Sequence, residues 1–181
     1  SRLVSQKGID LSIDAIATLL DANENIQLVC LGSGEASFEQ DFRVLRARYP
    51  DKVGVTIGYN EHLAHQIEAG SDVFLMPSRF EPCGLNQLYS LRYGTLPIVR
   101  NTGGLADSVV DASGDDLKHN LATGFKFEAA TAEALEDTLL RAVALFRHPR
   151  IWRRLVLTAM EQDYSWEKSA QRYHDLYHQL S

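Results

Sequence analysis

The sequence predicts an α/β fold built on a doubly wound parallel sheet. Three observations indicate this class: short apolar runs alternate with amphipathic stretches up to about Val110, the joints between them are short, and glycines mark several of these joints. Repeated strand–helix units of this kind place successive strands parallel, with right-handed crossovers. A chain of 181 residues is long enough to bury one proper core, so we expect one domain over residues 1–181.

The first units are predicted from apolar periodicity. Amphipathic stretches predict helices, and continuous apolar runs predict strands. The expected helices are residues 8–23, 36–49 and 61–69, and the expected strands are residues 26–31 and 53–57. Gly32, Ser33 and Gly34 lack the spacing of a dinucleotide fingerprint, so we expect only a tight turn near the ligand there.

The next two units are shorter and end in glycine-containing joints. Residues 72–78 form an apolar run ended by Pro77, which predicts a strand, a loop over 79–84 and a helix over 85–94. Leu85, Leu88, Tyr89 and Leu91 are expected on one side of that helix. A strand over 96–100, a turn over 101–104 and a helix from Leu105 complete the pattern.

The pattern changes after Val110. Residues 111–120 read as a polar loop and residues 124–128 as a short edge strand. Helices are then expected over residues 132–147, 150–163 and 166–180, with Pro149 separating the first two.

Composition excludes several classes of protein. Hydrophobic residues make up 45% and charged residues 23%, which excludes a disordered chain, and no apolar run approaches membrane-spanning length. The net charge of −6 supplies no basic field for nucleic acid, so local groups must hold any phosphorylated ligand. We therefore expect neither a nucleic acid nor a membrane as partner.

Cysteine and histidine usage predicts neither a disulfide nor a metal site. Cys30 and Cys83 have neither disulfide-framework nor zinc spacing, which is typical of a protein from a reducing cytoplasm. Cys83 has no histidine nearby in sequence, which argues against a nucleophile. The histidine pairs 62/65 and 174/178 lack an acidic metal-binding pattern.

Glu81 is the most informative candidate residue. It comes just before a predicted helix, where the free amides of Cys83, Gly84 and Leu85 can bind phosphate or sugar oxygens. An acid beside an anion site fits a ligand with one anionic end and one hydroxylated end. Glu81 would accept hydrogen bonds from the hydroxyls of that ligand. The alternative is that Glu81 merely stabilises the helix N-terminus. The second glycine turn, Gly103 and Gly104, favours the ligand site, because both turns then lie at one sheet edge.

These segments resemble a known family. Residues 78–89 (SRFEPCGLNQLY) and 93–109 (YGTLPIVRNTGGLADSV) are similar to the bacterial glycogen synthases and plant starch synthases, retaining glucosyltransferases of the GT-B fold. Residues 1–8 (SRLVSQKG), 57–60 (IGYN) and 163–177 (DYSWEKSAQRYHDLY) resemble further motifs of that family. The resemblance therefore covers essentially the whole chain.

The resemblance implies three catalytic residues. Arg2 and Lys7 match the basic pair that holds the donor diphosphate, where they neutralise the leaving group without a metal. Glu81 matches the acid that contacts the donor glucose. The alternative for Arg2 and Lys7 is solvated surface charge.

The resemblance also implies the residues that bind the substrate. Tyr59 matches the aromatic residue that stacks on adenine, although a turn tyrosine covering the core is the alternative. Asn86 stands where some relatives have threonine, and the backbone amide at this position can bind the ligand with either side chain. The implied positions are Tyr59, Cys83, Gly84, Leu85, Asn86, Thr102, Gly103 and Gly104.

As a whole, the resemblance implies the C-terminal, donor-binding half of an enzyme that transfers glucose from ADP-glucose to an α-1,4-glucan. The chain begins without Met, where the family has the end of a strand, so the glucan acceptor is expected mainly on a missing N-terminal domain. No cofactor is expected beyond the donor. Many more distant GT-B relatives carry a second Glu where this chain has Tyr89, so no residue is assigned to the ribose.

Two alternatives to this function remain open: a retaining GT-B transferase with another donor, and a non-catalytic nucleotide- or glycan-binding module. The last helix, within residues 165–181, either packs on the N-terminal domain or closes this domain's own core. The apolar residues that would form its contact face are Trp166, Tyr173, Leu176, Tyr177 and Leu180.

Overall fold

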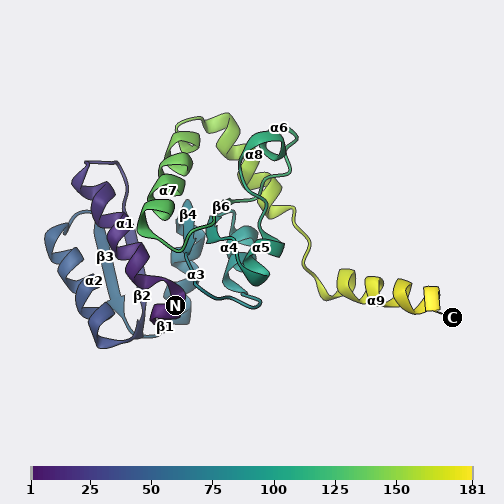
Figure 1. Ribbon diagram of the computed structural model, residues 1–181, viewed down its shortest axis with the longest axis horizontal. Coiled ribbons are helices and arrows are strands. Elements are labelled where there is room, and N and C mark those ends of the chain that lie inside the picture. Colours follow the sequence, from purple (N-terminus) through teal and green to yellow (C-terminus); the bar gives the residue numbers. More distant parts are fainter. Residues whose placement is uncertain (1, 181) are drawn as a thin grey trace.

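The computed structural model describes residues 2–180 and shows alternating strands and helices (Figure 1). The strands are β1 (Arg2–Leu3), β2 (Leu28–Gly34), β3 (Val53–Ile57), β4 (Val73–Met76), β5 (Leu96–Arg100) and β6 (Phe125–Phe127). The helices are η1 (Ser5–Lys7), α1 (Ile9–Asp21), α2 (Ala36–Arg48), α3 (Glu61–Gly70), α4 (Asn86–Tyr93), α5 (Gly103–Ser108), α6 (Gly114–Lys118), α7 (Ala132–Phe146), α8 (Pro149–Met160) and α9 (Trp166–Leu180).

The strands form two parallel sheets rather than the single sheet we predicted. One sheet has the order β1-β2-β3 and the other β4-β5-β6, and every pairing is parallel. In the described chain β1 has only two residues, both paired with β2, and β4 is paired with β5 alone. The winding therefore runs outward from β1 in one direction and from β4 in the other. This is the doubly wound order, with its reversal between β1 and β4.

One hydrophobic core joins the two sheets into a single unit. The same buried cluster includes Leu19 of α1, Val53 of β3, Ile98 of β5 and Leu135 of α7. α7 packs against both α1 and α8, so it bridges the two sheets. The shared core fixes the two sheets relative to each other, and hydrogen bonds join the segments that follow β1 and β4.

Two joints differ from the prediction. The tight turn expected at Gly32, Ser33 and Gly34 is wrong, because these residues extend strand β2. Gly34 instead permits close pairing, since a Cβ there would lie 2.2 Å from the Leu3 carbonyl oxygen. The helix expected from Leu105 begins earlier, at Gly103, and Thr102 is its N-cap.

Two further differences lie after Val110. The polar loop expected over residues 111–120 contains the short helix α6, whose end is marked by Asn120 with φ of +59°. Helix α9 projects away from the rest of the molecule (Figure 1), and Trp166 at its start is 87% exposed. The alternative that this helix closes the domain's own core is therefore wrong. Leu180's side chain lies outside the described structure.

The approach of η1 to the loop after β4 requires a glycine at position 8. Gly8 has φ of +66°, and a Cβ there would lie 2.1 Å from the Pro77 carbonyl oxygen. We expect Gly8→Ala to lower the free energy of unfolding by more than about 1 kcal/mol, because a left-handed backbone and a collision coincide. Urea unfolding measures the change. Gly70→Ala, with open space around it, is the control, and equal stability of the two variants would contradict the packing described.

Candidate functional site

Lys7 and Glu81 form an ion pair at the point where the winding reverses. Lys7 ends η1, directly after β1, and Glu81 lies in the loop after β4. The Lys7 ammonium donates to Glu81 Oε2, and the buried Ser78 hydroxyl donates to the same oxygen at 3.3 Å. The side chains of Lys7 and Glu81 are only 21% and 10% exposed, so water screens this pair weakly.

Backbone and side-chain hydrogen bonds hold the two loops together. The Arg79 amide donates to the Gln6 carbonyl at 2.8 Å, and the Gln6 side chain donates to the Phe80 carbonyl at 3.1 Å. The Arg79 guanidinium donates to the Ser5 carbonyl at 2.9 Å and to both carboxylate oxygens of Asp10 at 2.7 and 2.6 Å. The backbone on each side of the Lys7–Glu81 pair is therefore fixed.

Arg100, at the end of β5, supports the Glu81 loop from the neighbouring strand. Its Nε donates to the Ser78 carbonyl at 2.9 Å, and its Nη2 donates to the Arg79 carbonyl. These carbonyls follow Pro77, where the strand pairing has ended. The guanidinium therefore replaces the missing backbone partners and fixes the start of the loop.

The glycine turn after β5 packs directly on the same loop. A Cβ on Gly103 would lie 2.2 Å from the Glu81 carbonyl oxygen, and one on Gly104 would lie 2.0 Å from that of Cys83. The Gly104 amide donates to the Glu81 carbonyl at 3.1 Å. The two glycine turns meet at one edge, as predicted. The Gly104 amide already donates to a carbonyl of the protein, so it is not free for a ligand.

The backbone amides before α4 remain available. In the hydrogen bonds of residues 2–180, the N–H groups of Cys83, Gly84 and Leu85 do not appear as donors. Gly84 has φ of +72°, and α4 begins at Asn86. Successive free amides at a left-handed turn and a helix start attract anions, and here they lie in the same loop as Glu81.

Tyr59 and Arg2, two other predicted residues, lie on or just after strands of the first sheet, β1-β2-β3. Tyr59 is 87% exposed just after β3, on the outer strand of its sheet, where Asn60 caps α3 by accepting from the Leu63 amide at 2.9 Å. The tyrosine does not cover the core, so that alternative is wrong. Arg2 is exposed on β1, opposite Ser33. Arg79 and Arg100, which hold the Glu81 loop, were not predicted from the sequence, because their hydrogen bonds are tertiary contacts. The same holds for the buried Gln87, which donates to the Cys83 and Gly84 carbonyls.

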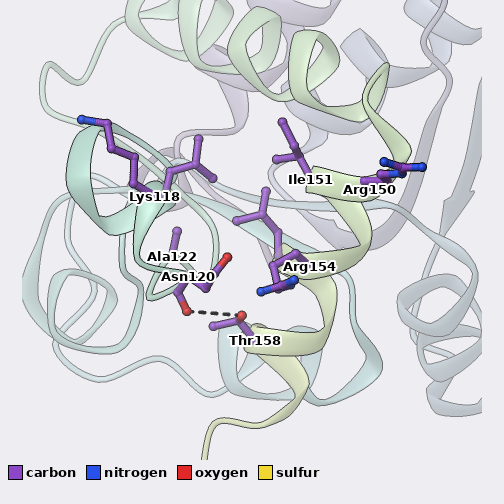
Figure 2. Close-up of a pocket in the computed structure, with 9 residues that line it drawn as sticks. Lys118, Asn120, Ala122, Arg150, Ile151, Arg154 and Thr158 are labelled. Carbon is purple, nitrogen blue, oxygen red and sulfur yellow. Dashed lines mark hydrogen bonds between the residues drawn. The ribbon is translucent and has the colours of Figure 1, made fainter.

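A separate cavity of about 370 Å³ lies between α6 and α8, away from the Lys7–Glu81 pair. Figure 2 shows Lys118 on α6 and Arg150 and Arg154 on α8 at its border. Leu117, Ala122, Ile151 and Leu155 supply apolar lining. Glu81 and the free amides of residues 83–85 are not among the residues that line this cavity.

Within the part of the chain that the structure describes, the two cysteines form no disulfide, and no metal-binding cluster is present. Both cysteines are free thiols, and burial raises the pKa of Cys30 to about 11, so it stays protonated. Among the described residues, no three His, Cys, Asp or Glu side chains are placed to hold a metal ion. Residues 2–180 also contain no helix with the length and apolar character needed to cross a bilayer.

The chain matches the family model described as "Glycosyl transferases group 1" over residues 1–153. Since this match covers far more than half of the chain, the protein belongs to that glycosyltransferase family. Membership agrees with a site at the winding reversal of a doubly wound α/β fold.

Within the family, the chain is similar to glycogen synthases. It is 58% identical to the glycogen synthase of Thioalkalivibrio sulfidiphilus over 179 residues, and 53% identical to that of Haemophilus influenzae over 180 residues. Each match covers 99% of this chain and 37% of the relative. The chain thus spans little more than a third of the length of these relatives. The predicted resemblance is confirmed.

Solved structures confirm the predicted fold class. The catalytic domain of starch synthase IV from Arabidopsis thaliana, bound to ADP and acarbose, matches with a TM-score of 0.86 and 39% identity, over 99% of this chain and 37% of that one. A C-terminal domain of a group 1 glycosyl transferase from Francisella tularensis shares the fold, with a TM-score of 0.68 and 16% identity, over 88% of this chain and 79% of that one. The Rossmann-like arrangement is therefore that of GT-B glycosyltransferases.

The Arg79–Asp10 pair makes the stability of this edge depend on pH. Hydrogen bonds from Arg79 lower the pKa of Asp10 below its ordinary value of 3.8. A lowered pKa in the folded chain stabilises it above the unfolded pKa, and the contribution is lost as the pH falls through the folded value. We expect Asp10→Asn to be less stable than the wild type at about pH 7, with a gap that narrows below about pH 4.

Urea midpoints between about pH 7 and about pH 2.5 test this expectation. Asp14→Asn, an exposed position on the same helix, is the matched control. A gap for Asp10→Asn that stays constant across this range would show that the pair contributes nothing through its charge.

Proposed function

We propose that this chain is the donor-binding part of a glycogen synthase, which transfers glucose from ADP-glucose to the non-reducing end of an α-1,4-glucan with retention of configuration. The observation that carries the proposal is the Lys7–Glu81 pair beside the free amides of Cys83, Gly84 and Leu85. A cation and free amides suit a diphosphate, and an acid suits sugar hydroxyls. Similarity to glycogen synthases and to an ADP-bound starch synthase supports the same donor.

The proposed chemistry divides the work between the two ends of the donor. As the bond from the anomeric carbon to the diphosphate breaks, the electron pair leaves with ADP, and Lys7 and Arg2 stabilise the growing negative charge. Glu81 and the Cys83 and Gly84 amides orient the glucose, and the carboxylate offsets the positive charge that develops on the sugar. Binding the donor requires Lys7 to share its charge between Glu81 and phosphate.

The nucleobase is assigned to Tyr59. A ring that is 87% exposed on the loop after β3 offers a free face for stacking. Stacking of a base on an aromatic residue is worth about 1–3 kcal/mol. Thr102, Gly103, Gly104 and Asn86 are assigned to the surroundings of the sugar and phosphates, although Gly104 contributes there through close packing rather than a free amide.

The acceptor is assigned to another part of a longer protein. The chain spans 37% of the length of its glycogen synthase relatives, so we propose that residues 1–181 act as a C-terminal domain beside an N-terminal one. The aromatic side chains of α9 suit this arrangement: Trp166, Tyr173 and Tyr177 are exposed and available to pack on the partner domain. By this account the chain alone binds the donor without elongating glucan, and the whole enzyme works in the cytoplasm without a cofactor.

Calorimetric titration with ADP, UDP and ADP-glucose tests the proposal. We expect ADP and ADP-glucose to bind, and Tyr59→Ala to weaken ADP binding by roughly 5- to 150-fold, as loss of stacking predicts. Lys7→Ala should weaken it by at least about tenfold, because a charge-assisted contact is lost and Glu81 is left unpaired near the phosphates.

Matched controls are Tyr177→Ala and Lys168→Ala, both exposed residues of α9. These should leave the affinity for ADP unchanged. Tighter binding of UDP than of ADP would favour a GT-B transferase with another donor. If the wild-type chain binds none of the three ligands, the assignment of a donor site is overturned.

A further inference from the structure

Gln87 lies beneath the loop that carries the free amides. Its side chain is almost fully buried, and the whole residue is 1% exposed. Its Nε2 lies 3.1 Å from the Cys83 carbonyl oxygen, 3.1 Å from that of Gly84 and 3.2 Å from Ser108 Oγ. One buried amide therefore connects two successive carbonyls of the Glu81 loop with α5.

The surroundings determine which end of the Gln87 amide faces this cluster. Carbonyl oxygens only accept hydrogen bonds, and the Ser108 hydroxyl already donates to the Gly104 carbonyl at 2.6 Å. All three neighbours thus present acceptors. The NH2 group, and not the oxygen, must point toward them.

The positions of these two carbonyls set the direction of the amides that follow. In a trans peptide the N–H points opposite to the C=O, and residues 2–180 contain no cis peptide bond. Since the Cys83 and Gly84 carbonyls are directed at Gln87, the N–H groups of Gly84 and Leu85 point to the opposite side. These two N–H groups appear as donors in none of the hydrogen bonds described.

The other end of the amide is unsatisfied. Gln87 Oε1 is buried without a hydrogen-bond partner among the described residues. It lies where a Cβ on Gly84 would approach within 2.4 Å, and Gly84 has φ of +72°, a left-handed backbone conformation that favours glycine. An apolar side chain of the same length would avoid an unpaired buried oxygen. Glutamine differs from such a side chain at position 87 by supplying an NH2 donor to the two carbonyls.

We propose that Gln87 is a positioning residue: its NH2 group holds the Cys83 and Gly84 carbonyls inward, so that the Gly84 and Leu85 amides stay directed at the phosphate or sugar oxygens of the donor. The assignment of the ligand rests on the proposed function. The orientation of the loop does not, because it follows from the contacts of the ligand-free chain.

The variant Gln87→Met tests the proposal in the 181-residue chain. Methionine keeps the side chain's length and removes both the NH2 donors and the unpaired oxygen, so we expect the variant to unfold cooperatively. We expect calorimetry to show at least about tenfold weaker ADP binding. Gln162→Met is the matched control, because Gln162 also donates to a carbonyl four residues earlier, at 3.0 Å, but just after the end of α8. It should bind ADP as the wild type does.

Amide NMR separates positioning from folding. In the free Gln87→Met chain, the ¹H and ¹⁵N shifts of Gly84 and Leu85 should change while those of β2 and β3 do not. ADP should move the Gly84 and Leu85 signals in the wild type and not in the variant. Unchanged shifts together with wild-type affinity would overturn the proposal.

A second variant keeps the test decisive if Gln87→Met does not fold. Gln87→Glu keeps the shape and places an oxygen against two carbonyls, so it should weaken ADP binding at least as much. If the wild-type chain binds no ADP, the proposed function fails. The amide chemical shifts of Gly84 and Leu85, compared between the wild-type and variant chains without ligand, then still decide whether Gln87 orients these two amides.

Discussion

The partly buried ion pair between Lys7 and Glu81 is the contact on which the rest of the site depends. It joins the segments that follow β1 and β4, the two strands from which the winding runs in opposite directions. Even a partly buried pair is costly to desolvate, and removing one partner leaves an uncompensated charge. The fold keeps it in position with bonds that do not involve the pair itself: the Arg79 contacts to η1 and the Arg100 contacts to the loop after β4.

Around this pair, glycines allow close backbone approach, and buried hydrogen-bond donors orient the loops. Gly8, Gly103 and Gly104 let three segments of backbone approach one another more closely than any side chain would permit. The Gly104 amide then serves the fold, whereas the Gly84 and Leu85 amides face away from Gln87 and stay open. The proposed site, for a ligand with anionic and hydroxylated ends, thus consists mostly of oriented backbone, with Glu81 and Lys7 at its centre.

The sequence predicted the strands best where apolar runs had clear ends. Residues 53–57 and 96–100 match β3 and β5, and Glu81 and the glycine turns meet as expected. The face of α4 was predicted wrongly: Leu85 and Tyr89 are exposed, while Gln87 and Ser90 are buried with Leu91. Hydrophobic periodicity cannot anticipate a buried glutamine whose partners are carbonyls of the preceding loop and a serine on α5. The division into two sheets depends on tertiary packing, which no local pattern encodes.

A double-mutant cycle on Lys7→Met and Glu81→Gln, with unfolding free energies measured with and without saturating ADP, tests the central claim most directly. Without ADP, the account predicts a favourable coupling of at least about 1 kcal/mol between the two side chains. With ADP, the coupling should fall, because the charge of Lys7 is then shared with phosphate. Zero coupling in the free chain, or a coupling that ADP leaves unchanged, would contradict a single site formed across β1 and β4.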